Sequence, residues 1–489
     1  MSDVLSKLGR QTPIYVLGIL ANRLAGFLML PIYTSYLRPA DYGVLELLTL
    51  TVEAIGIMGA VGLSAGVMKF HAAYESAQDK REVISTSALG IIGLMTIVAG
   101  AGVAASGPLS AVILGEAGSP TLFRIFFVIY LLQQAEIVPL LLLRVQGRAV
   151  AFVVVNLTKL ALMLVMNVWF VVYEGLGVLG VLVSNLIASS LFSVGLMAYL
   201  LISSGRAFSG PKFREMLRFG RPMMFWFLGS FVMVSSDRFF LNHFAGPYEV
   251  GLYSLAYRFM AILPALTFVP FYQAWDPQRF GLAGEKGVAE TFTRAFTYLN
   301  IAIAGVALGI CVFTEDVIRV MATPEFYAAH QVVPLLIASQ ILWSLVGFVN
   351  LGLLLRDRTD ILGRLAVVTV LVILGLDLAL IPRFGIIGAA TATLITYALR
   401  FALVLRASQQ HYRIDYDWQR VFSVYAIAVV VVVVDVLLPS LPVAISMVVG
   451  LALISVALLA AWAIVLNHRE RAYIFSLLRS LRDVIWRGA

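Results

Sequence analysis

Long apolar runs, separated by short turns rich in glycine, proline and charge, make up most of the chain. A helix needs about 20 apolar residues to cross a bilayer, and most of the runs reach that length. The pattern predicts an all-α polytopic membrane protein with about fourteen transmembrane helices. Twelve or thirteen spans remain an alternative, because two of the runs, 177–203 and 443–466, have indistinct ends. The expected spans are approximately 13–36, 43–70, 83–106, 122–143, 150–172, 177–203, 221–244, 249–275, 291–313, 331–355, 361–381, 385–407, 421–438 and 443–466.

The composition excludes most soluble classes of protein. Hydrophobic residues make up 61% of the chain and charged residues 13%, whereas soluble domains carry about 25% charged residues. The single cysteine, Cys311, excludes a disulfide framework, and the five histidines are scattered, so no metal site and no cofactor is expected. The chain also lacks a phosphate loop, a His-Glu-x-x-His motif and a Gly-x-Ser-x-Gly turn. An enzyme is therefore not expected.

The positive charges predict how the chain is oriented. With a cytoplasmic N-terminus, cytoplasmic segments hold 26 of the 35 lysines and arginines, four lie on the opposite side, and five lie within spans. Both termini are then cytoplasmic. The net charge of +8 follows from this bias, so nucleic acid is not expected as a partner. Lys7 and Arg10 precede a long span without a cleavage site, which argues against a removable signal peptide.

Short motifs recur at an offset of 208 residues. Pro39-Ala-Asp-Tyr-Gly43 matches Pro247-Tyr-Glu-Val-Gly251, and Gly177-Val-Leu-Gly180 matches Gly385-Ile-Ile-Gly388. Six spans per repeat make the halves parallel, with a cleft between them; a shared turn solution without duplication is the alternative. The predicted parts are an N-terminal six-helix lobe (1–205), an amphipathic cytoplasmic connector (206–220), a C-terminal six-helix lobe (221–407), two additional helices (421–466) and a basic amphipathic cytoplasmic tail (467–489).

Charged residues deep within spans mark a candidate site, because an ionisable group in hydrocarbon needs a partner or a cavity. Arg23, Arg258, Lys159 and Arg238 are the candidate substrate ligands, since arginine binds phosphate oxygens bidentately. Depth along the helices allows Arg23 to pair with Glu53, and Asp237 with Arg258. Arg238 is expected to point about 100° away from its neighbour and to line the cleft.

The remaining charged and aromatic groups have a simpler interpretation. Glu53 and Asp237 are candidates for charge pairing or for coupling to an ion gradient. Groups near the ends of spans are expected to be structural or reached by water. Tyrosines at the turns fit an interfacial belt better than a surface that stacks on sugars. The near-interface charges are Glu46, Asp377, Asp435 and Arg400, and the tyrosines are Tyr33, Tyr36, Tyr42, Tyr248, Tyr253 and Tyr257.

Three stretches resemble bacterial polysaccharide-transport flippases of the Wzx type. They are Asn22-Arg23-Leu-Ala-Gly26 through Asp41-Tyr-Gly43, Asp237-Arg238 with Gly246-Pro through Tyr257-Arg258, and Phe384-Gly385-Ile-Ile-Gly388. The resemblance covers about residues 10–407. It implies the fold of the multidrug/oligosaccharidyl-lipid/polysaccharide exporters, with two six-helix lobes that alternate access.

The resemblance further implies that the protein carries undecaprenyl-diphosphate-linked oligosaccharide to the outer leaflet, for O-antigen, capsule or exopolysaccharide synthesis. By similarity to the lipid II flippases, Arg23 and Arg258 would hold the diphosphate, whereas Glu53 stands on a span where those flippases carry an arginine. Membrane lipids, a polysaccharide polymerase and a chain-length regulator are candidate partners. A cation-coupled drug or metabolite exporter with the same lobes, and a scaffold in a synthesis complex, are the alternative functions.

Overall fold

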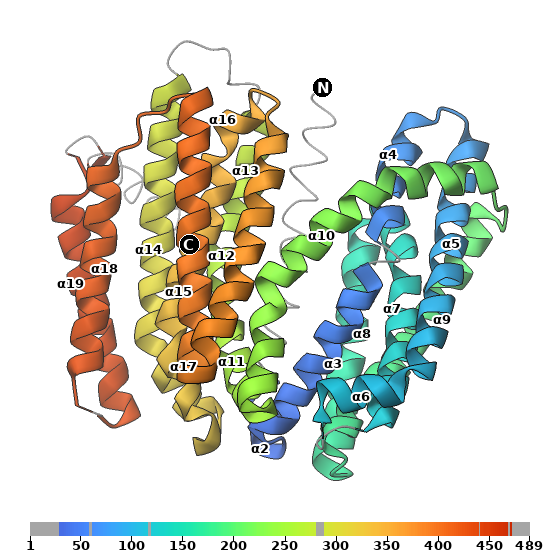
Figure 1. The fold of residues 1–489 in the computed structure, drawn as a ribbon, viewed down its shortest axis with the longest axis horizontal. Coiled ribbons are helices and arrows are strands. Elements are labelled where there is room, and N and C mark those ends of the chain that lie inside the picture. The colour runs from blue at the N-terminus through green and yellow to red at the C-terminus, as the bar shows by residue number, and fades with distance from the viewer. Residues whose placement is uncertain are drawn as a thin grey trace, which may run out of the picture. The chain divides into compact units, whose positions relative to one another are not determined.

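The chain folds into long helices, because a backbone in hydrocarbon must satisfy its own hydrogen bonds. The computed structural model describes residues 29–57, 61–115, 119–279, 288–439, 441–467 and 470–471. Within these ranges there is no strand, and eleven helices are long and apolar enough to cross a membrane. Figure 1 shows these helices as long coiled ribbons. The predicted all-α polytopic fold is confirmed.

Thirteen of the fourteen expected spans correspond to observed helices. Of the first expected span, 13–36, residues 13–28 lie outside the described residues, and its last turns form α2 (Leu30–Tyr36). The second is formed by α3 and α4, and the eleventh and twelfth are joined in α17 (Thr359–His411), where Gly385 breaks the helical dihedrals with φ 52° and ψ −131°. A count of long helices therefore gives one crossing for α17, although this helix covers two of the expected spans.

The chain divides into two compact units, which are described separately. The first comprises Met1–Tyr257, Met321–Val332 and Leu362–Arg400. In it α7 packs against α5 and α9, and α10 against α3 and α4. Its helices are α2 (Leu30–Tyr36), α3 (Pro39–Ile57), α4 (Val61–Ala73), α5 (Ala77–Ala104), α6 (Ser106–Ile113), α7 (Pro120–Val145), α8 (Ala149–Asn167), η2 (Val168–Tyr173), α9 (Gly177–Ser204), α10 (Gly210–Ala245), most of α11 (Pro247–Met260), η4 (Pro324–Val332) and the middle of α17.

The second unit comprises Arg258–Val320, Val333–Ile361 and Phe401–Ala489. Its core contains a cluster of aromatic rings in which Phe296 packs against Phe348 and Tyr416. The C-terminal helices α18 and α19 pack against each other. Its helices are α12 (Ile262–Leu266), α13 (Phe268–Arg279), α14 (Val288–Met321), α15 (Val333–Val349), α16 (Leu351–Leu354), the two ends of α17, α18 (Trp418–Leu437) and α19 (Val443–Ile464).

The connector predicted at 206–220 is continuous with the seventh span. Helix α10 starts at Gly210 with Pro211 in its first turn, where a proline has no hydrogen bond to lose. It then runs without interruption to Ala245, for 36 residues. The sequence pattern separated the two parts because hydropathy falls where Lys212, Arg214 and Arg218 project, although the helical backbone does not end there. The lobe boundaries themselves stay a prediction.

Equivalent positions of the proposed repeat share backbone features. Gly177 and Gly385, 208 residues apart, both have positive φ, at 54° and 52°. A Cβ on Gly43 would lie 1.9 Å from the Pro247 carbonyl oxygen, and one on Gly251 would lie 1.8 Å from that of Pro39. The first turns of α3 and α11 thus cross through a reciprocal contact of matched residues. Such a contact is what a twofold relation between duplicated segments produces.

Candidate functional site

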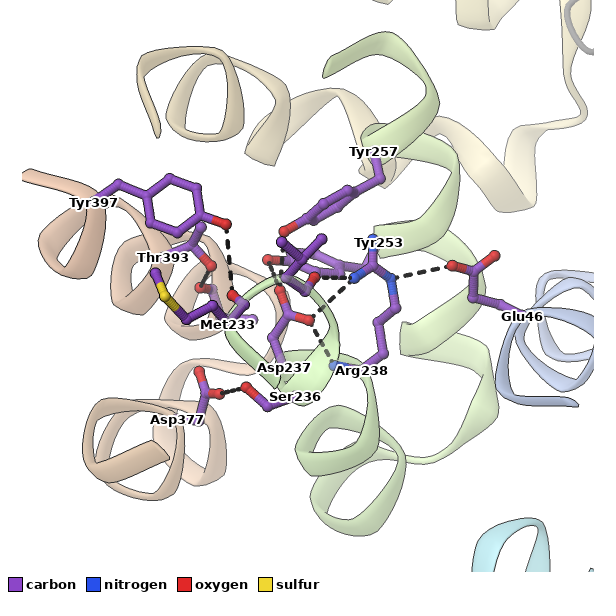
Figure 2. A network of polar contacts seen from close by, with 12 residues as sticks. Glu46, Met233, Ser236, Asp237, Arg238, Tyr253, Tyr257, Asp377, Thr393 and Tyr397 are labelled. Atoms are coloured by element: carbon purple, nitrogen blue, oxygen red, sulfur yellow. Dashed lines mark hydrogen bonds and ion pairs between the residues drawn. The ribbon is translucent and has the colours of Figure 1, made fainter. Parts of the chain in front are cut away.

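A buried polar network is centred on Asp237 and Arg238 of α10 (Figure 2). The network forms because α10 ends at Gly246, whose φ of 84° lets α11 begin immediately afterwards. Tyr253 and Tyr257, one helical turn apart on α11, then face α10. Their hydroxyls donate to Asp237 Oδ2 at 2.8 and 3.2 Å, respectively. The Asp237 carboxylate is therefore solvated by protein groups in place of water.

The Arg238 side chain bends back toward its own neighbour. Its Nη1 lies 3.2 Å from Asp237 Oδ1, and its Nε lies 3.3 Å from Glu46 Oε1 on α3. The guanidinium carbon lies 3.7 Å from the centre of the Tyr257 ring. The prediction that Arg238 points away from Asp237 into a cleft is wrong, because a long flexible side chain can return across the 100° between adjacent positions. Arg238 is 3% exposed, and two carboxylates balance its charge.

A second carboxylate lies beside the network. Asp377 of α17 is fully buried, and its Oδ2 accepts a hydrogen bond of 2.8 Å from Ser236. Within the described part of the chain, no hydrogen-bond donor reaches its Oδ1. The prediction that water reaches Asp377 near an interface is wrong, because α10 covers this face of α17. Arg400, also expected near an interface, is buried with Nη1 3.1 Å from Met233 Sδ.

The tyrosines divide into two groups. Tyr36 and Tyr248 are exposed, in agreement with an interfacial belt. Tyr42 and Tyr253 are buried and Tyr257 is half-buried, so the belt interpretation is wrong for these three. Tyr253 and Tyr257 both bind Asp237. The spacing of four residues, which places both rings on one face of the helix opposite an acidic residue, is the signal that could have found them.

Lys159 forms an ion pair elsewhere in the first unit. Its Nζ lies 2.6 Å from Oε2 of Glu136, which projects from α7 toward α8. Glu136 is 5% exposed, so this pair replaces the solvation that both groups lose on burial. The sequence placed Lys159 in a substrate cleft and gave it no partner. In this structure its charge is balanced by a neighbouring helix.

The other candidate residues have separate environments. Glu53 is exposed on α3, two turns after Glu46, so both carboxylates share one face of that helix. Arg258 lies half-buried on α11. Asp237 accepts hydrogen bonds from Arg238, Tyr253 and Tyr257, and its predicted pairing with Arg258 stays a prediction. Arg23 lies outside the described residues, and its predicted pairing with Glu53 stays a prediction.

The network offers charge and hydrogen bonds, and no group in it is arranged as a nucleophile with a general base. Among the residues that the structure describes, no three His, Cys, Asp or Glu side chains gather in the way a metal site requires. What the arrangement can do is hold or release a proton or an ion at a buried carboxylate, and join α3, α10, α11 and α17 through polar contacts.

Comparisons with known proteins show what this chain is similar to. The family model for polysaccharide biosynthesis proteins matches residues 8–278. The probable low-salt glycan biosynthesis flippase Agl15 of Haloferax volcanii is 26% identical over 161 residues, which is 32% of this chain and 33% of that protein. The matched region thus spans about a third of the curated relative.

Two solved structures have the same fold. The lipid II flippase MurJ in an inward closed conformation gives a TM-score of 0.73 at 12% identity, covering 90% of this chain and 97% of that one. An inward-facing multidrug resistance MATE family transporter gives 0.60 at 16% identity, covering 80% and 96%. The fold implied by the sequence resemblance is confirmed. Because the family model covers more than half of the chain, the protein belongs to the polysaccharide biosynthesis protein family.

Proposed function

We propose that this protein is a flippase that moves undecaprenyl-diphosphate-linked oligosaccharide from the inner to the outer leaflet of a bacterial inner membrane. The observation that carries the proposal is the family match over residues 8–278, combined with a fold shared with a lipid II flippase over 90% of the chain. No bond is made or broken in such a step. The product would supply O-antigen, capsule or exopolysaccharide synthesis.

The charge balance of the described residues divides the four candidate ligands. Arg238 is held between Asp237 and Glu46, and Lys159 by Glu136. A diphosphate would have to displace these carboxylates before either cation could bind it. By the resemblance to the lipid II flippases, we assign the diphosphate to Arg23 and Arg258, and from the ion pairs we give Arg238 and Lys159 the role of holding helices together. Arginine suits this ligand because its planar fork matches two phosphate oxygens.

Coupling to an ion gradient is assigned to the carboxylates of the network. A carboxylate that gains and loses a proton changes the balance of charge around Arg238, and so changes how firmly α3 is held to α10. Asp237 and Glu53 are the proposed coupling groups, and Asp377 joins them because its Oδ1 has no hydrogen-bond donor in the described structure. Transport in vesicles that is indifferent to a pH gradient would remove this part of the proposal.

The proposed cargo also implies an orientation in the membrane and a set of partners. Both termini would be cytoplasmic, with the predicted lobes 1–205 and 221–407 alternating around the substrate. Membrane lipids surround the protein, and a polymerase and a chain-length regulator would receive the product. A cation-coupled exporter with the same lobes is disfavoured, because the family match names polysaccharide biosynthesis and the match to a MATE transporter has the lower TM-score.

Charge reversal in the native host tests the assignment. Arg23→Glu and Arg258→Glu each place a negative charge where the diphosphate is proposed to bind, so surface polysaccharide is expected to disappear at unchanged membrane levels of the protein. Arg294→Glu is the matched control, because Arg294 is exposed and pairs with Glu290, one turn away on the same helix. Normal polysaccharide in both test variants would contradict the site assignment.

A further inference from the structure

Two adjoining cavities in the second unit differ sharply in character. The first has a volume of about 570 Å³ and a polar lining that includes Arg406, Gln410 and Arg413. The second has a volume of about 470 Å³ and lies among the apolar side chains of α14, α15 and α18. Trp418, the first residue of α18, lines both cavities. Both volumes fall in the range of small-molecule sites.

The polar cavity carries excess positive charge. Arg406 projects from the last turns of α17, and in the described structure no carboxylate pairs with it. Arg413 follows the end of α17 and has its Nε 3.1 Å from Asp415 Oδ1, in an exposed pair that contributes little to stability. Two arginines against one carboxylate leave one net positive charge. A phosphate group is the ligand that this pair of guanidinium groups fits.

The apolar cavity is open to the hydrocarbon of the bilayer. Its lining includes Ala338 on α15 and Ala428 on α18, whose small side chains leave room between the helices. Phe422 and Val429, also on α18, line it and are 67% and 60% exposed. These two residues lie on helices that cross the membrane, so a hydrocarbon chain can enter from the side. A hydrocarbon chain is also the ligand that such a lining suits.

The two cavities together match the two parts of a phospholipid: a cationic cavity that suits a phosphate group, and an apolar cavity that shares Trp418 with it. Tryptophan favours the boundary between headgroups and hydrocarbon, which is where the two parts of a lipid meet. The arginine-rich end of α17 is cytoplasmic in the orientation predicted from loop charge. The leaflet that would supply the lipid is therefore the inner one, whose anionic headgroups attract basic residues.

We propose that these cavities bind one anionic phospholipid of the inner leaflet, distinct from the transported cargo. Its phosphate lies between Arg406 and Arg413, and one acyl chain lies in the apolar cavity between α15 and α18. Because the site is formed by α14, α15, α17 and α18, a bound lipid joins the C-terminal helix pair to the rest of the second unit. A ligand that binds only the folded state stabilises it, so the lipid acts as a structural component.

Native mass spectrometry of the full-length protein, purified from membranes and delipidated by dilution into detergent, tests the proposal. Titration with phosphatidylglycerol is expected to load one lipid in preference to phosphatidylethanolamine. The double variant Arg406→Gln/Arg413→Gln is expected to weaken phosphatidylglycerol binding by about tenfold or more, since each arginine near an anionic surface contributes on the order of 1 kcal/mol. Arg294→Gln, which removes an exposed arginine outside the cavity, is expected to bind as the wild type does.

A second variant keeps the test independent of the arginines. Ala428→Phe fills the apolar cavity and is expected to lower the affinity for long-chain phosphatidylglycerol while leaving that for a short-chain analogue unchanged. Equal binding by the wild type and both variants would overturn the proposal. So would displacement of the lipid by inorganic phosphate, which would indicate a site for a free anion. Displacement by a lipid-linked oligosaccharide would overturn it as well, by making the site part of the cargo path.

Discussion

Arg238 of α10 lies with its Nε 3.3 Å from the Glu46 carboxylate of α3, while its Nη1 holds Asp237 on its own helix. One buried guanidinium therefore serves two carboxylates from different parts of the chain. Breaking a buried pair by removing one partner is costly because a charge is left without compensation, at about 3–5 kcal/mol. This cost makes Arg238 the most sensitive position of the network.

Replacing Arg238 with methionine is expected to destabilise the protein by about 3–5 kcal/mol, because the buried Asp237 carboxylate loses its cation and keeps only neutral hydrogen-bond donors. Arg238→Lys is also expected to destabilise the protein, since an ammonium lacks the planar fork with which the guanidinium binds both carboxylates. Thermal unfolding in detergent measures the effect, with Arg294→Met as the control. Equal unfolding midpoints for Arg238→Met and Arg294→Met would show that the network contributes nothing to stability.

Because α3 and α11 cross closely, alanine is expected to destabilise the protein at the two glycines of the crossing and to stabilise it slightly at a glycine elsewhere. Gly43→Ala and Gly251→Ala are each expected to destabilise by about 1–3 kcal/mol, because the new methyl overlaps a backbone carbonyl that cannot move away easily. Gly100→Ala in α5 meets nothing within 4 Å and is expected to stabilise slightly, since alanine is the better helix former. Unfolding midpoints of the three variants check the prediction, and three equal shifts would contradict the close crossing.

The pair between Lys159 and Glu136 predicts a compensating double variant. Lys159→Met alone is expected to lower membrane levels, because it leaves Glu136 charged and buried. Lys159→Met combined with Glu136→Leu removes both charges and is expected to restore both protein level and surface polysaccharide. A double variant that accumulates normally but makes no polysaccharide would show that Lys159 binds substrate after all.

Glu470, which follows α19 in the chain, is expected to contribute to the stability of the fold in a pH-dependent way. Partial burial acts to raise its pKa, but hydrogen bonds from Arg420, the Asn467 backbone and Tyr298 outweigh it, so the pKa is lowered from 4.5. A lowered folded-state pKa stabilises the protein above the unfolded value of 4.5, and this stabilisation is lost as pH falls through the folded value. Arg420 binds the carboxylate with both terminal nitrogens, each at 3.1 Å.

Glu470→Gln is accordingly expected to cost about 1.5–3 kcal/mol at pH 7, the range for a hydrogen bond to a charged group. The difference from the wild type is expected to shrink as the pH falls below 4.5. Glu290→Gln, which breaks an exposed pair, is the control and is expected to have little effect. Unfolding midpoints measured from pH 7 to pH 4 test this prediction. A difference between Glu470→Gln and the wild type that is constant with pH would exclude the ionic contribution.

The sequence predicted the helices well because hydropathy over 20 residues is a strong and local signal. The matched turn motifs, such as Pro39 to Gly43, fall where the structure has matched backbone features, but the duplication itself stays a prediction. The partners of the buried charges could not be predicted from the sequence. Asp237 binds tyrosines sixteen and twenty residues away, and Asp377 binds Ser236 across 141 residues. Such contacts depend on how helices are rotated and packed, which depth along a single helix does not determine.

Translocation by the purified protein in vesicles tests the central claim most directly. Undecaprenyl-diphosphate oligosaccharide would be placed in one leaflet, and its sugar would then be modified by a reagent that cannot cross the membrane. The account predicts that the wild type exposes the sugar on the opposite face faster than protein-free vesicles do, and that Arg258→Glu does not. Equal exposure with the wild type, with Arg258→Glu and without protein would contradict the proposal that this protein is a flippase.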